Sequence, residues 1–496
     1  MSTTETRSFL DALQDPDLFR DQAFIDGEWV TADDGSTFDV LDPATGQTLA
    51  KVPAMGAGET AAALDAADRA FRDWGGALAK DRARVMRRWA DLMRENSEDL
   101  SIILTAEQGK PMAESRAEVE YAASFLEWFG EEAKRVYGDV IPTPMDGRRI
   151  VVLKEPLGVT GGITPWNFPS AMVTRKCSPA LAAGNTMVLK PAEQTPLSAL
   201  AVCVLAERAG LPPGVFNVVT APAENAPDIG AALTSDPRLR MLGFTGSTEV
   251  GKLLMSQCAA TVTKVSLELG GNAPFIIFED ADLEVALGAM TSCKFRNSGQ
   301  TCISANRILV HESVHDEFLE MLTAFAKALK VGNGTEDDIQ IGPLIDEQGL
   351  QKVKRHVSNA IDSGAEVVVG GSPDERGGLF FQPTVLANVS PAMDMSCEET
   401  FGPVAGIIPF STEEQAIEIA NDTPYGLCAY FFTKDIARAW RVGEALEAGI
   451  VGLNTGFVST EVAPFGGVKE SGIGREGSKY GIEEWVETKY FTFAGL

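Results

Sequence analysis

The sequence predicts an α/β fold built on parallel sheets, and two observations lead to this class. From Gly158 onward, short strands alternate with helices, and these strands are apolar throughout, as strands buried between two helical layers are. The chain has 496 residues, of which 45% are hydrophobic and 23% charged. This is an ordinary globular balance, and the length suffices for about three domains.

The first 140 residues are expected to be mainly helical after a short extended segment at 24–30. Between Glu59 and Arg135, apolar residues recur at spacings of three and four, which is the period of an amphipathic helix. The alternating series follows. It predicts strands at 159–163, 186–190, 215–219 and 240–244, with helices at 170–183 and 197–209.

A second α/β series is expected after Gly270-Gly271, which we interpret as a hinge or domain crossing. It begins with an apolar strand at 273–278 and a helix starting near Leu283, for which Asp280 and Asp282 offer caps. Residues 488–493 alternate polar and aromatic side chains, so this last strand needs a sheet to join.

Charge and cysteine content exclude several classes of protein. Seventy acidic residues against 42 basic ones leave a net charge of −28, which disfavours nucleic-acid and membrane-surface binding. An anionic substrate would therefore need a locally basic site. The seven cysteines form no Cys-x-x-Cys pair, which indicates a reducing compartment. Without an apolar leader or a long apolar run, we expect a soluble, cytoplasmic protein.

Three side chains are candidates for chemistry, each with an alternative. Cys302 follows small polar residues and is expected at a loop–helix junction where N–H groups lower its pKa; otherwise it is a buried structural cysteine. Glu268 lies between two leucines and is either solvent-facing or a base with a raised pKa. Asn167 follows a strand and either donates to an oxyanion or caps the next helix.

Nucleotide-binding residues are expected where the parallel strands end. Lys190 and Glu193 follow the second strand and are placed to hold ribose hydroxyls. Gly246 and Ser247 lie at a helix start, where N–H groups can meet a pyrophosphate. Neither a G-x-G-x-x-G segment nor a P-loop is present. The three histidines support neither a metal site nor a Ser-His-Asp hydrolase.

Taken together, seven segments resemble the aldehyde dehydrogenase superfamily and occur in the order typical of that family. They span 164–169, 190–193, 244–247, 267–271, 299–302, 399–403 and 464–467. The resemblance implies that Cys302 attacks the aldehyde, that Asn167 stabilises the oxyanion, and that Glu268 activates water. It also implies a set of cofactor-binding residues: Ile163, Thr164, Pro165, Trp166, Lys190, Glu193, Gly246, Ser247, Val250, Leu269, Glu399 and Phe401.

The cofactor implied by this resemblance is NAD, with NADP as the second candidate. Glu193 would repel the 2′-phosphate of NADP, so we expect a preference for NAD.

Within the superfamily, segments 174–176, 294–297 and 472–481 resemble the succinate-semialdehyde dehydrogenase branch. The implied substrate-binding residues are Arg175, Arg296, Ser459 and Phe465. Arg175 lies eight residues past Asn167, about two helical turns, so both can face one pocket. Arginine suits carboxylates because its donors are paired. The alternative for each arginine is a structural ion pair.

The expected activity is therefore oxidation of a short ω-carboxylated semialdehyde, with succinate semialdehyde as the first candidate. Three alternatives remain at this point: glutarate semialdehyde as substrate, a broad-range aldehyde dehydrogenase with structural arginines, and a catalytically idle binding protein.

The resemblance also implies a three-part architecture. We expect a dinucleotide-binding domain (1–140 and 160–269), a catalytic domain (270–468) and a small oligomerisation sheet (141–159 and 486–496). It further implies a homodimer or a homotetramer.

Overall fold

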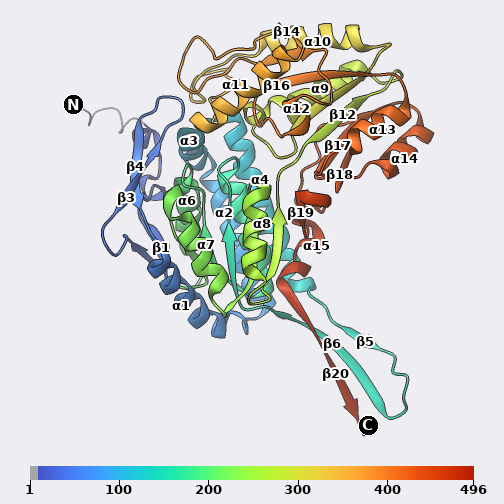
Figure 1. Ribbon diagram of the computed structural model, residues 1–496. Coiled ribbons are helices and arrows are strands. Elements are labelled where there is room, and N and C mark those ends of the chain that lie inside the picture. The colour runs from blue at the N-terminus through green and yellow to red at the C-terminus, as the bar shows by residue number, and fades with distance from the viewer. Residues whose placement is uncertain (1–8, 496) are drawn as a thin grey trace.

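The computed structural model describes residues 9–495 and shows an α/β protein in three parts (Figure 1). Two large sheets carry helices on their faces, and a third, small sheet projects from the body. The α/β class and the three-part arrangement predicted above are both present. Residues 1–8 and Leu496, which fall within the first domain and the last strand predicted above, lie outside the described residues.

The first sheet has the strand order β19-β11-β10-β7-β8-β9-β1-β2, and its five central strands are parallel. The chain fills one side of β7 first and then the other, so the order reverses between β7 and β10. Ligands bind at such reversals, outside the carboxyl ends of the strands. The strands are β1 (Ala23–Ile25), β2 (Glu28–Val30), β7 (Val159–Ile163), β8 (Thr186–Lys190), β9 (Phe216–Val218), β10 (Leu239–Thr245), β11 (Lys264–Glu268) and β19 (Gly472–Ile473).

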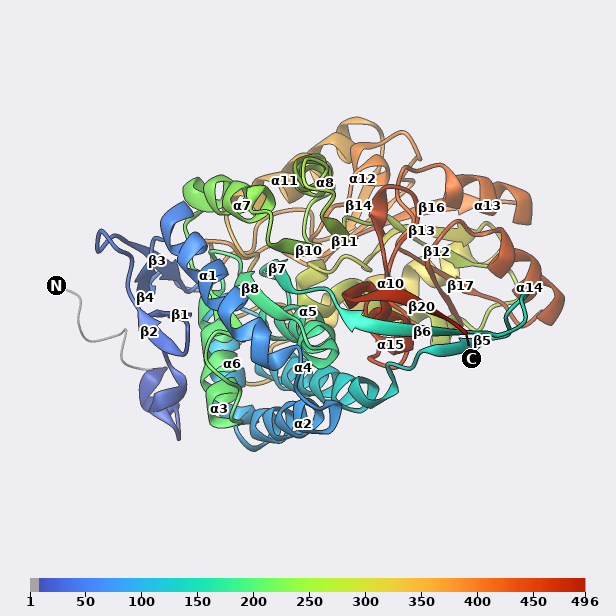
Figure 2. The same cartoon turned by 90° about the horizontal axis from the view of Figure 1, so that it is seen from below.

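Helices cover both faces of this sheet, which explains why its strands are apolar on both sides (Figure 2). One face packs against α1 (Ala57–Trp74), α7 (Ala226–Ser235) and α8 (Thr248–Cys258). The other packs against α2 (Ala79–Glu95), α3 (Ser97–Gln108), α4 (Met112–Glu132), α5 (Pro169–Ala183) and α6 (Pro196–Arg208).

The prediction for the first 140 residues was incomplete. A two-stranded ribbon, β3 (Thr37–Leu41) with β4 (Thr48–Pro53), precedes α1. The side chains of β3 are mostly exposed or half-buried, so the strand carries little of the apolar pattern that identifies a buried strand.

The second sheet has the order β14-β15-β16-β13-β12-β17-β18 and is parallel except for β14. Its strands are β12 (Ala273–Ile277), β13 (Ala305–His311), β14 (Glu366–Val369), β15 (Thr384–Ala387), β16 (Val404–Phe410), β17 (Cys428–Phe432) and β18 (Ile450–Leu453). Its helices are α9 (Leu283–Met290), α10 (His315–Ala328), α11 (Glu347–Asp362), α12 (Asp394–Cys397), α13 (Glu413–Asn421) and α14 (Ile436–Ala445).

Of the two caps predicted for α9, the structure selects Asp282, whose side chain accepts from the Val285 N–H. Asp280 instead accepts from the N–H groups of Lys434 and Asp435. The carboxylate of Asp280 therefore ties two loops together instead of capping a helix.

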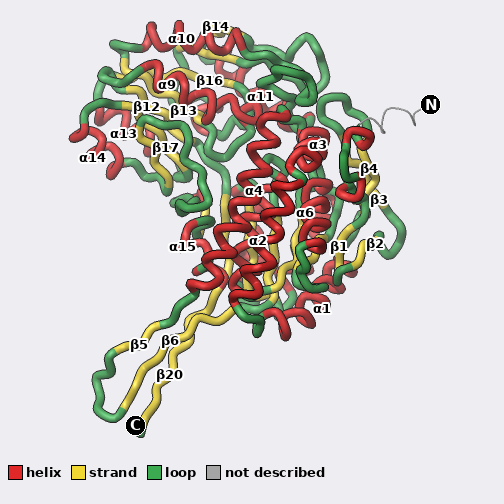
Figure 3. The backbone as a smooth tube through the Cα atoms, turned by 180° about the vertical axis from the view of Figure 1, so that it is seen from behind, coloured by secondary structure: helices red, strands yellow, loops and turns green. Residues whose placement is uncertain are grey.

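The small sheet pairs β20 (Val486–Ala494) with β6 (Arg148–Pro156) and β6 with β5 (Asp139–Ile141), all antiparallel. Figures 1 and 3 show this arm extending away from both large sheets. Several of its apolar side chains are exposed, among them Val140, Tyr490 and Phe493. No helix within residues 9–495 combines the length and apolar character needed to cross a bilayer.

Candidate active site

The predicted cofactor segments meet at one edge of the first sheet. Strand register aligns Ile163 of β7 with Lys190 of β8 and with Phe244 of β10, and aligns Thr245 with Glu268 of β11. The residues that follow these strands consequently leave the sheet side by side. This edge is the carboxyl edge at the strand-order reversal, where the fold favours a ligand.

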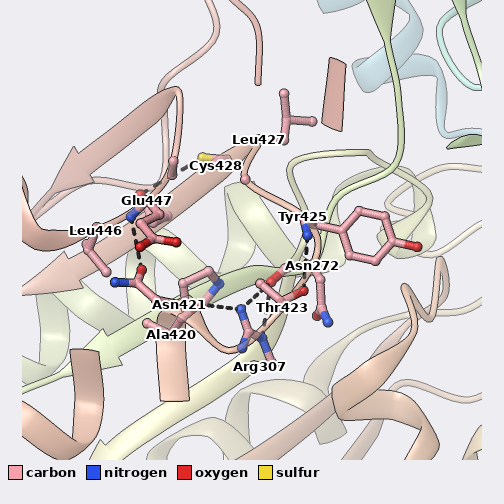
Figure 4. Close-up of a pocket in the computed structure, with 14 residues that line it drawn as sticks. Asn272, Arg307, Ala420, Asn421, Thr423, Tyr425, Leu427, Cys428, Leu446 and Glu447 are labelled. Carbon is pink, nitrogen blue, oxygen red and sulfur yellow. Dashed lines mark hydrogen bonds between the residues drawn. The ribbon is translucent and has the colours of Figure 1, made fainter. Parts of the chain in front are cut away.

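The crossing between the two large sheets brings the second sheet's residues to the same place. The Gly271 N–H donates to Glu399 Oε1 (3.3 Å), and a Cβ added at Gly271 would lie 2.4 Å from the carbonyl oxygen of Cys302. Only glycine fits so close to that backbone. The next residue, Asn272, is held by Arg307, whose guanidinium donates to the carbonyls of Asn272 and Ala420 (Figure 4).

A cavity of about 380 Å³ lies at this crossing and joins the reactive residues to the cofactor segments. Cys302 and Asn167 line it together with these predicted cofactor residues: Pro165, Trp166, Gly246, Ser247, Leu269, Glu399 and Phe401. These residues could hold part of a dinucleotide beside Cys302. Among residues 9–495, no group of three His, Cys, Asp or Glu side chains is placed to hold a metal ion.

Five predicted cofactor residues do not line this cavity: Ile163, Thr164, Lys190, Glu193 and Val250. Thr164 donates its N–H to the Lys190 carbonyl (3.1 Å), which continues the β7–β8 pairing. The buried Lys190 ammonium pairs with the half-buried Glu193 carboxylate at 2.9 Å. Val250 lies in the first turn of α8, where its N–H donates to Ser247 Oγ (3.4 Å).

Glu399 and Phe401 form the part of the cavity supplied by the second sheet. Burial raises the pKa of Glu399 to about 7, so its carboxyl titrates near neutral pH. Phe401 adopts a left-handed backbone conformation (φ +56°), and its ring meets Trp166 edge-on, with centroids 5.5 Å apart. Strain of this kind persists where surrounding contacts impose it, and it is common at ligand sites.

The surroundings of Cys302 correct two expectations. Cys302 lies in the loop before β13, not at a loop–helix junction, so no helix N-terminus acts on it. Burial raises the pKa of the Cys302 thiol to about 12, although the Arg175 cation opposes this shift. The free protein therefore holds Cys302 as a thiol at neutral pH, and attack on a substrate requires removal of its proton.

Glu268 is buried at the end of β11, with only 2% of its surface exposed, so the solvent-facing alternative is wrong. Neither carboxyl oxygen has a hydrogen-bond partner. Burial, and next the charge of Glu476, raise the pKa of Glu268 well above its ordinary value. A carboxylate whose pKa is raised in this way takes up a proton more readily than an ordinary one, as a general base must.

Asn167 is buried, and its Nδ2 donates to the Gln300 carbonyl at 3.2 Å, within the loop that carries Cys302. Helix α5 has Phe168 as its N-cap residue, and its first-turn N–H groups donate to Glu118 instead of to Asn167, so the alternative that Asn167 caps this helix is wrong. An amide nitrogen has two N–H donors. The second one has no partner among the residues that the structure describes, and Asn167 and Cys302 line the same cavity.

The predicted anion-binding residues differ in their contacts. Arg175 is buried in α5, pairs with Glu476 at 2.8 Å, and lies 4.1 Å from the centroid of the Phe465 ring. The structural ion pair considered for Arg175 is therefore present. The guanidinium of Arg296 lies 5.3 Å from the Phe168 ring centroid, and its buried Nε has no partner. The Ser459 hydroxyl lies 2.5 Å from that of Tyr121.

Sequence reasoning missed four residues of this site. Glu476 pairs with Arg175 and also with Lys176 (2.6 Å), and it belongs to the segment 472–481 already singled out. Lys352 and Gln348, on α11, line the cavity. Tyr121 and the two α11 residues carry no sequence signal, because each is one polar residue on an amphipathic helix.

Comparisons with known proteins agree with this geometry. The chain matches the aldehyde dehydrogenase family over residues 29–491. It is 56% identical to a glutarate-semialdehyde dehydrogenase of Pseudomonas aeruginosa over 98% of this chain and all of that protein. It is also 56% identical to a succinate-semialdehyde dehydrogenase (NADP(+)) of Escherichia coli, over 96% of this chain and 98% of that protein. The identity to a 3-sulfolactaldehyde dehydrogenase of Pseudomonas putida is likewise 56%, over 98% of this chain and 99% of that protein.

The solved structures include an NADP-dependent enzyme of Escherichia coli, which is 56% identical and superposes with a TM-score of 0.96. The match covers 97% of this chain and 100% of the other. Similarity over nearly the whole length of both chains, together with the family match, shows that this protein is a member of the aldehyde dehydrogenase family.

Proposed function

We propose that the protein oxidises a short ω-carboxylated semialdehyde to a dicarboxylate, with succinate semialdehyde as the first candidate. One observation carries the proposal. The positive charges of Arg175 and Arg296 both lower the pKa of the Cys302 thiol, so two cations lie near the nucleophile. They supply the locally basic site that an anionic substrate needs in a protein of net charge −28.

The residues support a covalent mechanism. The Cys302 thiol gives its proton to solvent, its sulfur bonds to the aldehyde carbon as the C=O π bond opens, and the new oxyanion accepts from Asn167 Nδ2 and the Cys302 N–H. NAD or NADP, when bound, would supply the hydride acceptor needed to oxidise this adduct to a thioester. Glu268 then takes a proton from water and the water oxygen attacks the thioester carbon. The C–S bond breaks, the acid leaves, and the proton held by Glu268 passes to the departing sulfur, which regenerates the thiol.

The proposal is tested by the rates of NADH formation with succinate semialdehyde, glutarate semialdehyde and an uncharged aldehyde of matched length. We expect a strong preference for the two carboxylated substrates. In Arg296→Met, kcat/KM for them should fall by about 10–100-fold, the usual effect of losing a charged hydrogen bond, with little change for the uncharged aldehyde.

The matched control is Arg238→Met, which removes a surface arginine paired with Asp236 and Asp65 and should leave all three rates unchanged. Equal rates for charged and uncharged aldehydes in the unmodified enzyme would contradict the proposal and mean that Arg175 and Arg296 have only structural roles.

Glutarate semialdehyde is the second candidate substrate, and the similarity to a glutarate-semialdehyde dehydrogenase favours it specifically. One additional methylene changes discrimination by only about 1–3 kcal/mol. The ratio of the two kcat/KM values decides between these candidates.

For the cofactor we propose NAD over NADP. Glu193 already neutralises Lys190 at 2.9 Å, so a 2′-phosphate placed there would meet a carboxylate and an occupied cation. Glu193→Ser should free Lys190 and raise the ratio of kcat/KM for NADP to that for NAD by at least about tenfold. The Glu193→Asp variant, which keeps the charge, is the control. An unmodified enzyme more efficient with NADP would contradict the proposal.

We also propose that the protein is a homodimer or homotetramer assembled through the projecting arm. The exposed apolar side chains of β5 and β20 support this, because an isolated three-stranded arm with exposed Val140, Tyr490 and Phe493 leaves apolar surface in water.

A further inference from the structure

We propose that Lys110 is a positioning residue for the oxyanion donor, acting through the main-chain carbonyl of Asn167. The inference rests on the proposed role of Asn167 in the oxidation. Lys110 lies between α3 and α4, far from the cavity-lining segments in sequence, and none of the predicted catalytic steps uses it.

The contacts of the Lys110 ammonium are short and fully enclosed. Its Nζ donates to the Asn167 carbonyl oxygen (2.7 Å) and to Glu118 Oε2 (2.6 Å). It also lies 3.9 Å from the centroid of the Phe168 ring. Lys110 and Glu118 are both buried, so the pair is not a screened surface ion pair.

Glu118 holds the other side of the same turn. Its second oxygen, Oε1, accepts from the N–H groups of Ser170 (2.9 Å) and Ala171 (3.2 Å), in the first turn of α5. The ion pair therefore fixes the backbone on both sides of Phe168: the Asn167 carbonyl before it and the start of α5 after it. Rotation of this turn would move the Asn167 amide away from the Gln300 carbonyl, in the loop that carries Cys302.

The Asn167 carbonyl also connects to the loop that carries the nucleophile. Asn297 Nδ2 donates to it (3.0 Å) and to the Gln300 carbonyl (3.2 Å), which also accepts from Asn167 Nδ2. Gln108, two residues before Lys110, donates to Asn297 Oδ1 (3.0 Å). The segment Gln108–Lys110 thus orients the oxyanion donor and the Cys302 loop through one set of contacts.

A buried ion pair is weak support for a role in stability alone, because desolvation offsets its attraction. Burial lowers the pKa of Lys110, which shows that the ammonium is held at a cost. The effect of Lys110 on the position of Asn167 is a separate property. Stability and positioning can therefore be measured independently.

The test is a double-mutant cycle on the single-turnover rate of NADH formation. Lys110→Met should lower that rate by about 10–100-fold, because misplacing a catalytic group by about 1 Å has an effect of this size. In the Asn167→Ala background, the same change should lower it by less than about threefold, since the group it positions is gone. The dissociation constant for NAD should stay unchanged.

Two further variants separate positioning from folding. Lys110→Met with Glu118→Gln removes both buried charges, and it should fold yet remain slow, because the donor to Asn167 is still missing. Glu118→Gln alone keeps that donor and should be faster than the double variant. Glu107→Gln is the matched control: Glu107 is a buried carboxyl that accepts from Leu197 N and Ser198 N at the start of α6, and its removal should leave the rate unchanged.

Two outcomes would overturn the inference. The first is that the fold-losses of rate caused by Lys110→Met and by Asn167→Ala multiply when the two changes are combined. The second is that Lys110→Met with Glu118→Gln has the rate of the unmodified enzyme. A normal rate in Asn167→Ala alone would instead remove the proposed function of Asn167. The two failures are therefore distinguishable.

Discussion

Replacing Cys302 with alanine should lower NADH formation to about one part in 10⁴ or less while leaving NAD affinity unchanged. The side chain supplies the atom that bonds to the substrate, and no other thiol lines the cavity among the described residues. Turnover is followed by NADH absorbance, and cofactor affinity by quenching of tryptophan fluorescence, since Trp166 lines the same cavity.

The control for thiol removal is Cys397→Ala, because Cys397 is a free and exposed cysteine outside that cavity. This variant should retain full activity. Persistent turnover in Cys302→Ala would contradict the covalent mechanism.

Replacing Glu268 with glutamine should separate the two halves of the reaction. Without this base, water is activated poorly, and steady-state kcat should fall by about 10²–10⁴-fold. One equivalent of NADH per site should still form in the first turnover, and the acylated enzyme should accumulate. Rapid-mixing absorbance measures the burst, and intact mass spectrometry detects the acyl group on Cys302.

The same variant tests the raised pKa of Glu268. The carboxyl must lose its proton to act as a base, so below its raised pKa the residue is protonated and inactive. The deacylation rate of the unmodified enzyme should therefore increase with pH through that pKa, and the increase should disappear in Glu268→Gln. Glu107→Gln removes another buried carboxyl, whose pKa burial raises to about 8, and it should leave the pH profile intact.

Several parts of the fold followed from local sequence. The strands predicted at 159–163 and 186–190 coincide with β7 and β8. A short, wholly apolar run bounded by turns is typical of a strand whose sheet is covered by helices on both faces. The expected positions of Asn167, Lys190 and Gly246 at strand ends followed from the same pattern. By contrast, β3 is mostly exposed or half-buried, and its pairing with β4 depends on contacts across a turn that apolar periodicity does not report.

The sequence by itself determined the fold class, the family and the residue types available for chemistry, because these depend on local patterns and on the order of motifs. Only the tertiary structure decided which groups share an environment. It places Glu476 against Arg175, 301 residues earlier in the chain, and the Lys110 ammonium against the carbonyl of Asn167. It also raises the pKa of Cys302, where the sequence predicted a lowered one. Burial and charge pairing are properties of three-dimensional neighbours, and residues this far apart in the chain become neighbours only when both sheets and the crossing between them have formed.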